Sequence, residues 1–141
     1  MTTLEGPSKF RTHHVALLRD LRAQAGLSQP ALANIVKRHR TWISKAESGH
    51  VNLTIDTVDL IRSALVPDEQ AKLPLRMRVA KAILAARAKT RPPMSQEALS
   101  ITAGCNIKYV SQLELGLVGT TLDQLAKVVE VLQLDYDEVF Q

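Results

Sequence analysis

Apolar residues recur at three- and four-residue spacing along most of the chain. The longest such stretches run from Thr12 to about Ala25, from Ile55 to Leu65 and from Leu75 to about Lys89. This spacing places apolar side chains on one face of an α-helix. The stretch 121–132 is of similar length to 55–65. Shorter segments with the same pattern are 28–36, 39–47, 95–103 and 106–114, and a last short helix is expected to end near Phe140. We therefore predict an all-α protein whose first eleven residues are a frayed tail.

Two stretches of the chain match each other without a gap at an offset of 67 residues. The first reads Leu-Ser-Gln-Pro-Ala-Leu-Ala from Leu27 and ends at Gly49; the second reads Met-Ser-Gln-Glu-Ala-Leu-Ser from Met94 and ends at Gly116. The register continues beyond them, because Thr-Ile-Asp-Thr-Val at 54–58 corresponds to Thr-Leu-Asp-Gln-Leu at 121–125. A match of this length predicts a duplicated supersecondary unit.

Each copy has the pattern of two short helices joined by a tight turn. Ser28 and Ser95 precede the first helix and can accept a hydrogen bond from an orphan N–H of its first turn. Gly49 and Gly116 follow the second helix, where a left-handed residue is usual. Two helices of about two turns joined by about four residues predict a helix-turn-helix.

Both copies resemble the Cro/phage-repressor helix-turn-helix family, also known as the xenobiotic-response-element family. The resemblance is carried by Ser-Gln, by Ile-Ser-x-x-Glu-x-Gly (Val-Ser-x-x-Glu-x-Gly in the second copy) and by the Thr-capped helix that follows. It implies two tandem lambda-repressor-like domains of four to five helices. Their expected bounds are 1–66 and 75–141, with a linker at 67–74 that holds two prolines. The implied function is that of a transcription regulator of bacterial, plasmid or phage origin, with repression favoured.

Composition narrows the class of protein further. The chain has 141 residues, of which 45% are hydrophobic and 4% aromatic, which fits one helical domain or two small ones. The sequence lacks the run of about eighteen apolar residues that would predict a membrane span. We therefore expect a cytoplasmic protein, and the implied DNA-binding function would associate it with the nucleoid. The single cysteine, Cys105, excludes an internal disulfide. His13 and His14 lack the neighbours of a metal site, and no catalytic triad or phosphate-binding loop is visible, so we expect neither an enzyme nor a cofactor.

The positive charge of the chain is unevenly distributed. The net charge is +4, and residues 1–66 carry nine Lys or Arg against five Asp or Glu, whereas residues 67–141 carry nine of each. The excess therefore lies in the first copy, where it favours a polyanionic partner. Residues 107–141 hold two lysines against six acids, which would repel a duplex if they faced it.

In a helix-turn-helix the second helix enters the major groove of DNA and its first residues face the base edges. By the resemblance, the contact residues of the first copy are Gln29, Arg38, His39, Arg40, Thr41, Trp42 and Lys45. Arg40 can bond guanine O6 and N7 together, and Lys45 can reach guanine or phosphate. The corresponding residues of the second copy are Gln96, Asn106, Lys108, Tyr109 and Gln112, beside the apolar Ile107. An aromatic residue at 42 or 109 is equally compatible with partial burial in the core.

Two further positions have a structural interpretation. The resemblance implies that Glu47 pairs with Arg22, and that Glu114 pairs with Lys89 or with Arg87. Lys37 replaces the glycine usual in the turn, where a positive φ costs a non-glycine residue about 1 kcal/mol.

Three organisations remain open at this stage. One chain with two helix-turn-helix units can imitate the two-fold dimer that reads a palindromic operator. Alternatively, only the basic first copy reads operator DNA, and the second forms a homodimer or receives a protein partner; the charge asymmetry favours this. The rival class is a protein-binding module, such as an antiactivator or an antitoxin.

Overall fold

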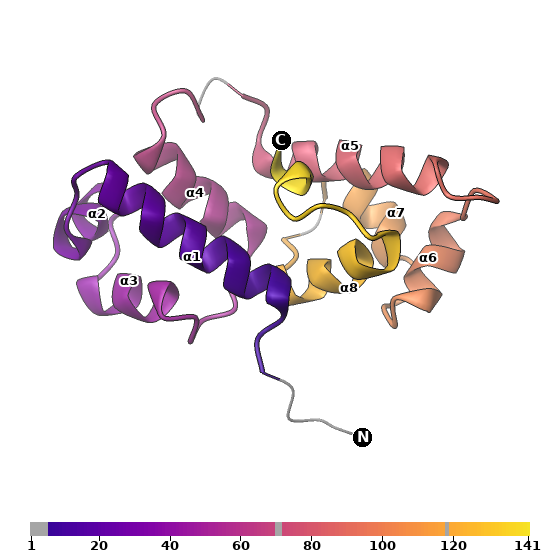
Figure 1. Cartoon of the computed structure of the whole chain (residues 1–141), viewed down its shortest axis with the longest axis horizontal. Coiled ribbons are helices and arrows are strands. Elements are labelled where there is room, and N and C mark those ends of the chain that lie inside the picture. The colour runs from indigo at the N-terminus through magenta and orange to yellow at the C-terminus, as the bar shows by residue number, and fades with distance from the viewer. Residues whose placement is uncertain (1–5, 70–71, 118) are drawn as a thin grey trace.

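The computed structural model describes residues 6–69, 72–117 and 119–141, and the regular structure of these residues is helical apart from one isolated β-bridge (Figure 1). The elements are α1 (Lys9–Gln24), α2 (Gln29–Val36), α3 (Arg40–Glu47), α4 (Ile55–Leu65), α5 (Leu75–Ala88), α6 (Gln96–Thr102), α7 (Tyr109–Glu114), α8 (Leu122–Leu132) and a final 3-10 turn, η2 (Glu138–Phe140). The prediction of an all-α protein is confirmed.

Five of the described helices begin at a Ser or Thr whose hydroxyl accepts a hydrogen bond from a backbone N–H of the first turn. These N-caps are Ser8, Ser28, Thr54, Ser95 and Thr121. The cap at Ser8 corrects the expected start of the first helix near Thr12. Phe10 is fully buried, so the apolar face of α1 extends one turn beyond the predicted start. The prediction of a frayed tail is therefore wrong for residues 9–11.

The helices form two sets that lie side by side (Figure 1). Helix α1 packs on α3 and α4, and α2 packs on α3 and α4; in the other set, α5 packs on α7 and α8, and α6 on α7 and α8. Between the sets, α1 contacts α8 and α4 contacts α5. Apolar side chains of both sets belong to one contiguous buried cluster. This core does not divide the chain at 67–74, so the two-domain organisation stays a prediction.

A local two-fold axis relates the two sets of helices where they meet. Thr54 and Thr121, which are 67 positions apart, lie opposite each other in the isolated antiparallel bridge. The N–H of Ile55 donates to the carbonyl oxygen of Thr120, and the N–H of Leu122 donates to that of Leu53, both over 2.9 Å. Ile55 corresponds to Leu122 and Leu53 to Thr120, each at an offset of 67, so the two hydrogen bonds are equivalent by the duplication. The axis therefore passes between the two threonines.

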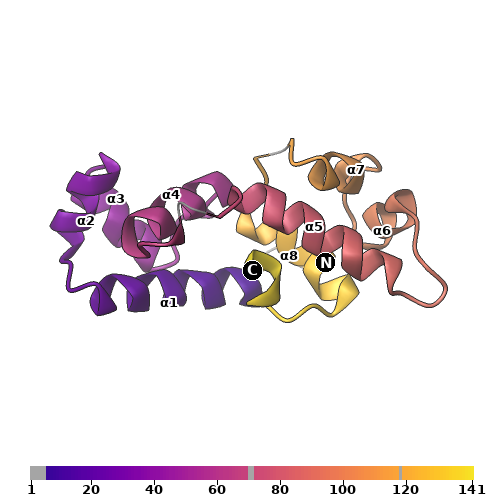
Figure 2. The same cartoon turned by 90° about the horizontal axis from the view of Figure 1, so that it is seen from above.

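Two ion pairs across the same boundary follow the same symmetry. Arg11 of α1 bonds Asp123 of α8 at 2.7 Å, and Arg76 of α5 lies 3.8 Å from Asp56 of α4. Asp56 and Asp123 are 67 positions apart, and the two arginines are 65 apart, because α1 and α5 correspond at that shorter offset. Figure 2 shows the consequence for the molecule: α3 and α7 lie at one edge, and α1 lies along the opposite edge.

The predicted linker is fixed to both sets of helices by a buried carboxylate. The side chain of Glu69 is 1% exposed and accepts hydrogen bonds from Nε of Arg62 at 3.1 Å and Nη2 of Arg78 at 2.5 Å. Arg78 also donates to the carbonyl oxygens of Leu73 and Phe140. Burial raises the pKa of Glu69 and the bonds from Arg78 and Arg62 lower it, with a net downward shift.

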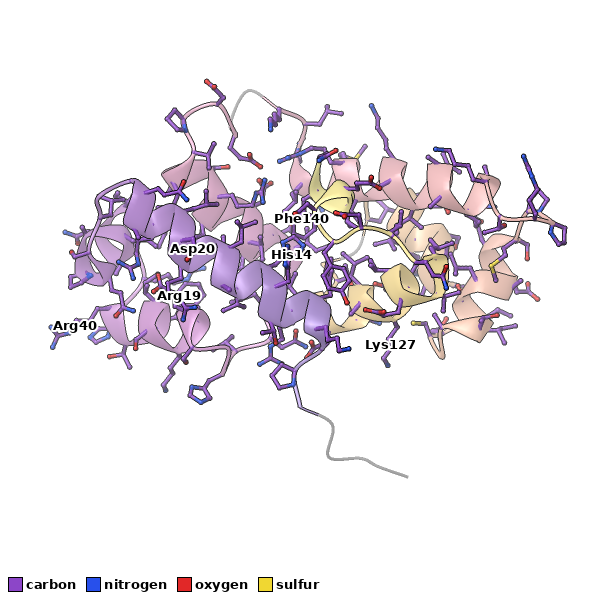
Figure 3. The ribbon with its side chains drawn as sticks, in the orientation of Figure 1. His14, Arg19, Asp20, Arg40, Lys127 and Phe140 are labelled. Atoms are coloured by element: carbon purple, nitrogen blue, oxygen red, sulfur yellow. The ribbon has the colours of Figure 1, made fainter. Side chains whose placement is uncertain are left out.

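A buried histidine lies at the contact between α1 and the C-terminal turn. His14 is 2% exposed, its Nε2–H donates to the carbonyl oxygen of Tyr136 over 2.9 Å, and its ring packs against Phe10 and Phe140. Figure 3 shows His14 beside Phe140 between the two sets of helices. Burial lowers the pKa of His14 to about 4 from the usual 6.5, and the charges of His13 and Arg62 act in the same direction.

We expect His14 to make the fold less stable in mild acid. The unfolded chain binds a proton at this residue near pH 6.5 and the folded chain only near pH 4, so the contribution of neutral His14 is complete above pH 6.5 and is lost as the pH falls. Between pH 7.5 and 5.5 the free energy of unfolding should fall by about 1.4 kcal/mol through this group. Urea unfolding at several pH values measures it. His14→Gln, which keeps a donor to the Tyr136 carbonyl, should flatten this dependence; an unchanged slope in that variant would exclude His14 as its cause.

Candidate nucleic-acid interface

The turn between α2 and α3 depends on a left-handed lysine. Lys37 has φ 57° and ψ 47°, and its N–H and that of Arg38 both bond the carbonyl oxygen of Ala33. The corresponding residue of the other set, Gly104, has φ 73°. Position 37 thus has the positive φ that is usual at this turn. The lysine side chain is exposed there, and its left-handed backbone conformation is strained.

Helix α3 begins at a histidine cap. Nδ1 of His39 accepts a hydrogen bond from the N–H of Thr41 at 3.1 Å. Because Nδ1 is the acceptor, the ring proton lies on Nε2, which is free to donate outward. A donor at this place suits a phosphate oxygen.

The outer face of α3 is polar and cationic, and its inner face is part of the core. Ile43 and Ala46 are buried, whereas Arg40, Thr41 and Lys45 are exposed. In Figure 3, Arg40 points into solvent at the outer end of the molecule. The first turn of α3 contains no acidic residue.

Glu47 is neutralised inside the molecule and so does not oppose a polyanion. Arg22 donates to its two carboxylate oxygens at 2.5 and 2.9 Å and to the carbonyl oxygen of Leu27. The amide of Gln29 donates to the same carboxylate at 3.0 Å. The structure thus contains the pair between Arg22 and Glu47 that the resemblance implies, and it also fixes Gln29, a predicted DNA contact, at the start of α2.

Two further features shape this surface. The guanidinium of Arg38 lies over the half-buried ring of Trp42, 5.5 Å from its centroid, which holds one cation beside the start of α3. A hollow of about 340 Å³ lies between the beginnings of α2 and α3. Its lining residues are Gln29, Pro30, Arg40, Thr41 and Ser44. Donors from both helices therefore surround one concave site.

The second predicted groove-reading helix is shorter than expected. α7 begins at Tyr109 instead of Asn106, because residues 107 and 108 form a turn in which the Asn106 side chain accepts a bond from the N–H of Lys108. Tyr109 is 4% exposed, and its hydroxyl lies 2.6 Å from that of Thr120. The structure therefore places Tyr109 in the core, and we leave it out of the interface proposed below.

The remaining predicted contacts of the second copy lie on the surface. Asn106, Lys108 and Gln112 are exposed, while the amide of the half-buried Gln96 donates to Glu114 at 2.8 Å. Ile107 is exposed beside them.

The ion pair of Glu114 corrects one predicted partner. Arg87 donates to both of its carboxylate oxygens, at 2.8 and 3.0 Å, and to the carbonyl oxygen of Met94. Lys89, the other predicted partner, is exposed at the C-cap of α5. The network of Arg87, Glu114 and Gln96 thus repeats that of Arg22, Glu47 and Gln29.

Corresponding surface positions of the two sets differ in polarity. After α3 come the exposed Ser48 and His50, and after α7 the corresponding residues are Leu115 and Leu117, which are 64% and 67% exposed. The exposed Arg40 likewise corresponds to Ile107. The surface around α7 is therefore poorer in hydrogen-bond donors than that around α3.

One acidic residue of the second copy, Glu97, is exposed near α7, in the first turn of α6, whereas Glu114, Asp123 and the acids of the C-terminal stretch are paired or lie elsewhere. Asp123 is engaged by Arg11, and Glu114 by Arg87. The acidic C-terminal stretch 135–138 leads into η2, which lies at the edge opposite to α3 and α7 (Figure 2). The acids of the C-terminal stretch would therefore not face a duplex that is bound at α7.

Several residues that position this interface are missed by sequence reasoning. Ser100 is buried and joins α6 to α7, because its hydroxyl accepts from the N–H of Val110 and donates to the carbonyl oxygen of Gln96. Arg11 and Asp123, which align the two sets of helices, are missed as well. The one sequence signal for that pair is the repetition of an aspartate at 56 and 123, just after the Thr cap of each copy.

Residues 15–66 match the family model of a helix-turn-helix domain. The match begins within α1 and ends just after α4, so it contains the α2–turn–α3 unit described above. It supports a DNA-binding regulator, and domains of this family are typically non-enzymatic. No curated protein and no solved structure matches the chain.

Two further observations concern the described residues only. None of their helices is long and apolar enough to cross a membrane. They contain no group of three or more His, Cys, Asp or Glu side chains placed to hold a metal ion.

Proposed function

We propose that this protein is a sequence-specific DNA-binding transcription regulator of bacterial, plasmid or phage origin, and we favour a repressor over an activator. Its α3 lies in the major groove, with Arg40, Thr41 and Lys45 toward the base edges. The observation that supports this most is the cationic outer face at the start of α3, within the segment that matches a helix-turn-helix family. The bound protein would repress transcription by occluding a promoter. It would act in the cytoplasm, associated with the nucleoid.

The remaining first-copy contacts fit a phosphate-binding role around that helix. Lys37 and Arg38 are exposed at the turn, and the outward Nε2–H of His39 can donate to a phosphate oxygen. Gln29 borders the hollow between α2 and α3. These groups would set the orientation of α3 without reading the sequence.

We further propose the domain bounds expected from the sequence, 1–66 and 75–141 with a linker at 67–74. In support, each set of helices contains its own buried ion pair at the groove-reading helix, Arg22 with Glu47 and Arg87 with Glu114. The shared core would then be the contact between two domains that do not separate.

The test is a salt series on DNA selected from a random pool. Four exposed cations, Lys37, Arg38, Arg40 and Lys45, surround α3, and each displaces about one condensed counterion when it meets the duplex, whether it bonds a phosphate or a guanine, so we expect about four counterions to be released. The affinity measured by fluorescence anisotropy should then fall about 100-fold between 50 and 200 mM salt. Binding that does not weaken with salt, or no binding even at 50 mM, would contradict the proposal.

A protein-binding module is the second candidate, and one observation favours it. Leu115 and Leu117 are highly exposed after α7, and apolar side chains of this size are common at protein contacts. Under this candidate the chain would not bind DNA at low salt, and 75–141 would carry the partner site.

A further inference from the structure

We infer that one chain binds one duplex at an asymmetric site, with α3 over a half-site that contains G·C pairs and α7 over an A·T-rich half-site. This inference rests on the proposed function. The inference adds the class of DNA sequence that the molecule recognises and the number of chains that bind one duplex.

The two-fold contact between helix-turn-helix units is already complete within the chain. Paired helix-turn-helix units recognise palindromes because the two-fold axis of the protein coincides with that of the operator. Here the axis passes between Thr54 and Thr121, and the symmetric bonds, the ion pairs and the shared core occupy the contact around it. A second chain is not needed to supply a second unit.

The helices α3 and α7 lie on the same side of the molecule. Both lie at one edge of the molecule, and the acidic C-terminal stretch lies at the other (Figure 2). The carboxylate nearest to each helix, Glu47 or Glu114, is buried or half-buried and paired with an arginine. A duplex along this edge would therefore meet both helices without facing an unpaired acidic cluster.

The local two-fold axis relates positions that carry different side chains. At corresponding positions α3 offers Arg40, Thr41 and Lys45, and the second set offers Ile107, Lys108 and Gln112. Lys108 lies in the turn before α7, and we assign it to a phosphate, so Ile107 and Gln112 remain to meet the base edges. Arginine and lysine bond the O6 and N7 acceptors of guanine, glutamine bonds adenine through N6 and N7, and an apolar side chain fits the methyl group of thymine. The backbone symmetry therefore presents two chemically unequal reading surfaces, and the half-sites must differ accordingly.

The two units also differ in the groups that they offer to DNA phosphates. His50 follows α3, and its Nε2 can bond a DNA backbone, whereas Leu117 in the corresponding place cannot. The one O–H of Ser48 is engaged with the carbonyl oxygen of Lys45 and lies beside the His50 ring, which it positions. Most of the salt-dependent affinity would then come from the half-site under α3, and α7 would add base preference with few backbone contacts.

The experiment uses the full chain and DNA selected from a random pool. Sedimentation should give one chain per duplex, and footprinting should show two unequal protected segments. Two symmetrised probes are then made, one with two copies of the α3 half-site in inverted orientation and one with two copies of the α7 half-site. The wild-type chain should bind both at least tenfold more weakly than the selected asymmetric site.

A variant with exchanged chemistry makes the test specific. Ile107→Arg, Lys108→Thr and Gln112→Lys together give α7 the residues of α3 at exposed positions, and should make the symmetrised α3 probe the preferred one by at least tenfold. Asp20→Asn, which adds the same net charge on the exposed face of α1, should leave the preference unchanged. Far-UV circular dichroism checks the fold of the variant; the stoichiometry and the symmetrised probes test the inference on the wild-type chain alone.

The outcomes separate the two proposals. Two chains on a palindrome, or protection of one half-site only with no effect of Lys108→Ala and Gln112→Ala, would overturn the inference while the proposed function stands. Absence of any DNA binding would overturn both.

Discussion

Replacing Arg40 and Lys45 together with alanine should lower the affinity for selected DNA about 100-fold. Both side chains are exposed on the outer face of α3, so their loss leaves the core residues Ile43 and Ala46 in place. A good contact to a base edge is worth about 1–3 kcal/mol, and two such contacts give a change of this size. Fluorescence anisotropy with the selected duplex at fixed salt measures it, and the discrimination against unrelated DNA should fall as well.

A matched control separates groove contacts from total charge. Lys9→Ala with Lys89→Ala removes two positive charges from exposed positions. Lys9 begins α1, along the edge opposite to α3 and α7 (Figure 2), and Lys89 borders a hollow that Glu138 and Gln141 of the C-terminal turn also line. We expect less than a threefold change in affinity for this pair. Equal losses in the two double variants would mean that the chain attracts DNA through its net charge and that α3 reads no bases.

The helical elements are predictable because they depend on local sequence. The 3.6-residue spacing of apolar residues and the caps at Ser28, Ser95 and Thr121 predict the starts of three helices correctly. The start of α1 is missed because the burial of Phe10 depends on Tyr136 and Phe140, which are distant in sequence. The start of α7 is missed because nothing local distinguishes the turn at 107–108 from the cap at His39.

The contact residues show the same division between local and distant effects. The pair of Arg22 and Glu47 is predicted at a separation of 25 residues, and the same separation leads from Glu114 to Lys89. The actual partner, Arg87, lies 27 residues before Glu114, because the stretch from Arg87 to the cap Ser95 is two residues longer than that from Arg22 to Ser28. Two helical residues that are two positions apart point in different directions, so an insertion of two residues changes which cation forms the pair.

The two-fold contact was beyond sequence reasoning for a different reason. The duplication shows that two units exist, but it does not show which surfaces meet. Asp56 and Asp123 are each explained locally, as acids in the first turn of a helix. Only the fold places Arg11 and Arg76 opposite them, and this placement determines that α3 and α7 share an edge.

Replacing Glu69 with alanine should lower the free energy of unfolding by about 3–5 kcal/mol. The change would leave the guanidinium groups of Arg62 and Arg78 without their shared carboxylate, and Arg78 is itself buried at 6% exposure. An uncompensated buried charge costs far more than a lost surface pair, and the carboxylate of Asp59, 3.9 Å from Nη2 of Arg78, is too distant for a replacement hydrogen bond. Urea unfolding at pH 7.5, where the carboxylate is ionised in both the folded and unfolded states, gives the value.

The neighbouring exposed acid provides the control. Asp68→Ala changes the same net charge one residue away and should stay within about 0.5 kcal/mol of the wild type. Because Glu69 joins the predicted linker to α4, α5 and the carbonyl of Phe140 through its two arginines, its loss should also loosen the contact between the two sets of helices. Glu69→Ala should therefore unfold at lower urea and weaken discrimination between the asymmetric and symmetrised DNA probes. A loss of less than 1 kcal/mol would show that the linker is held by its apolar neighbours and not by this carboxylate.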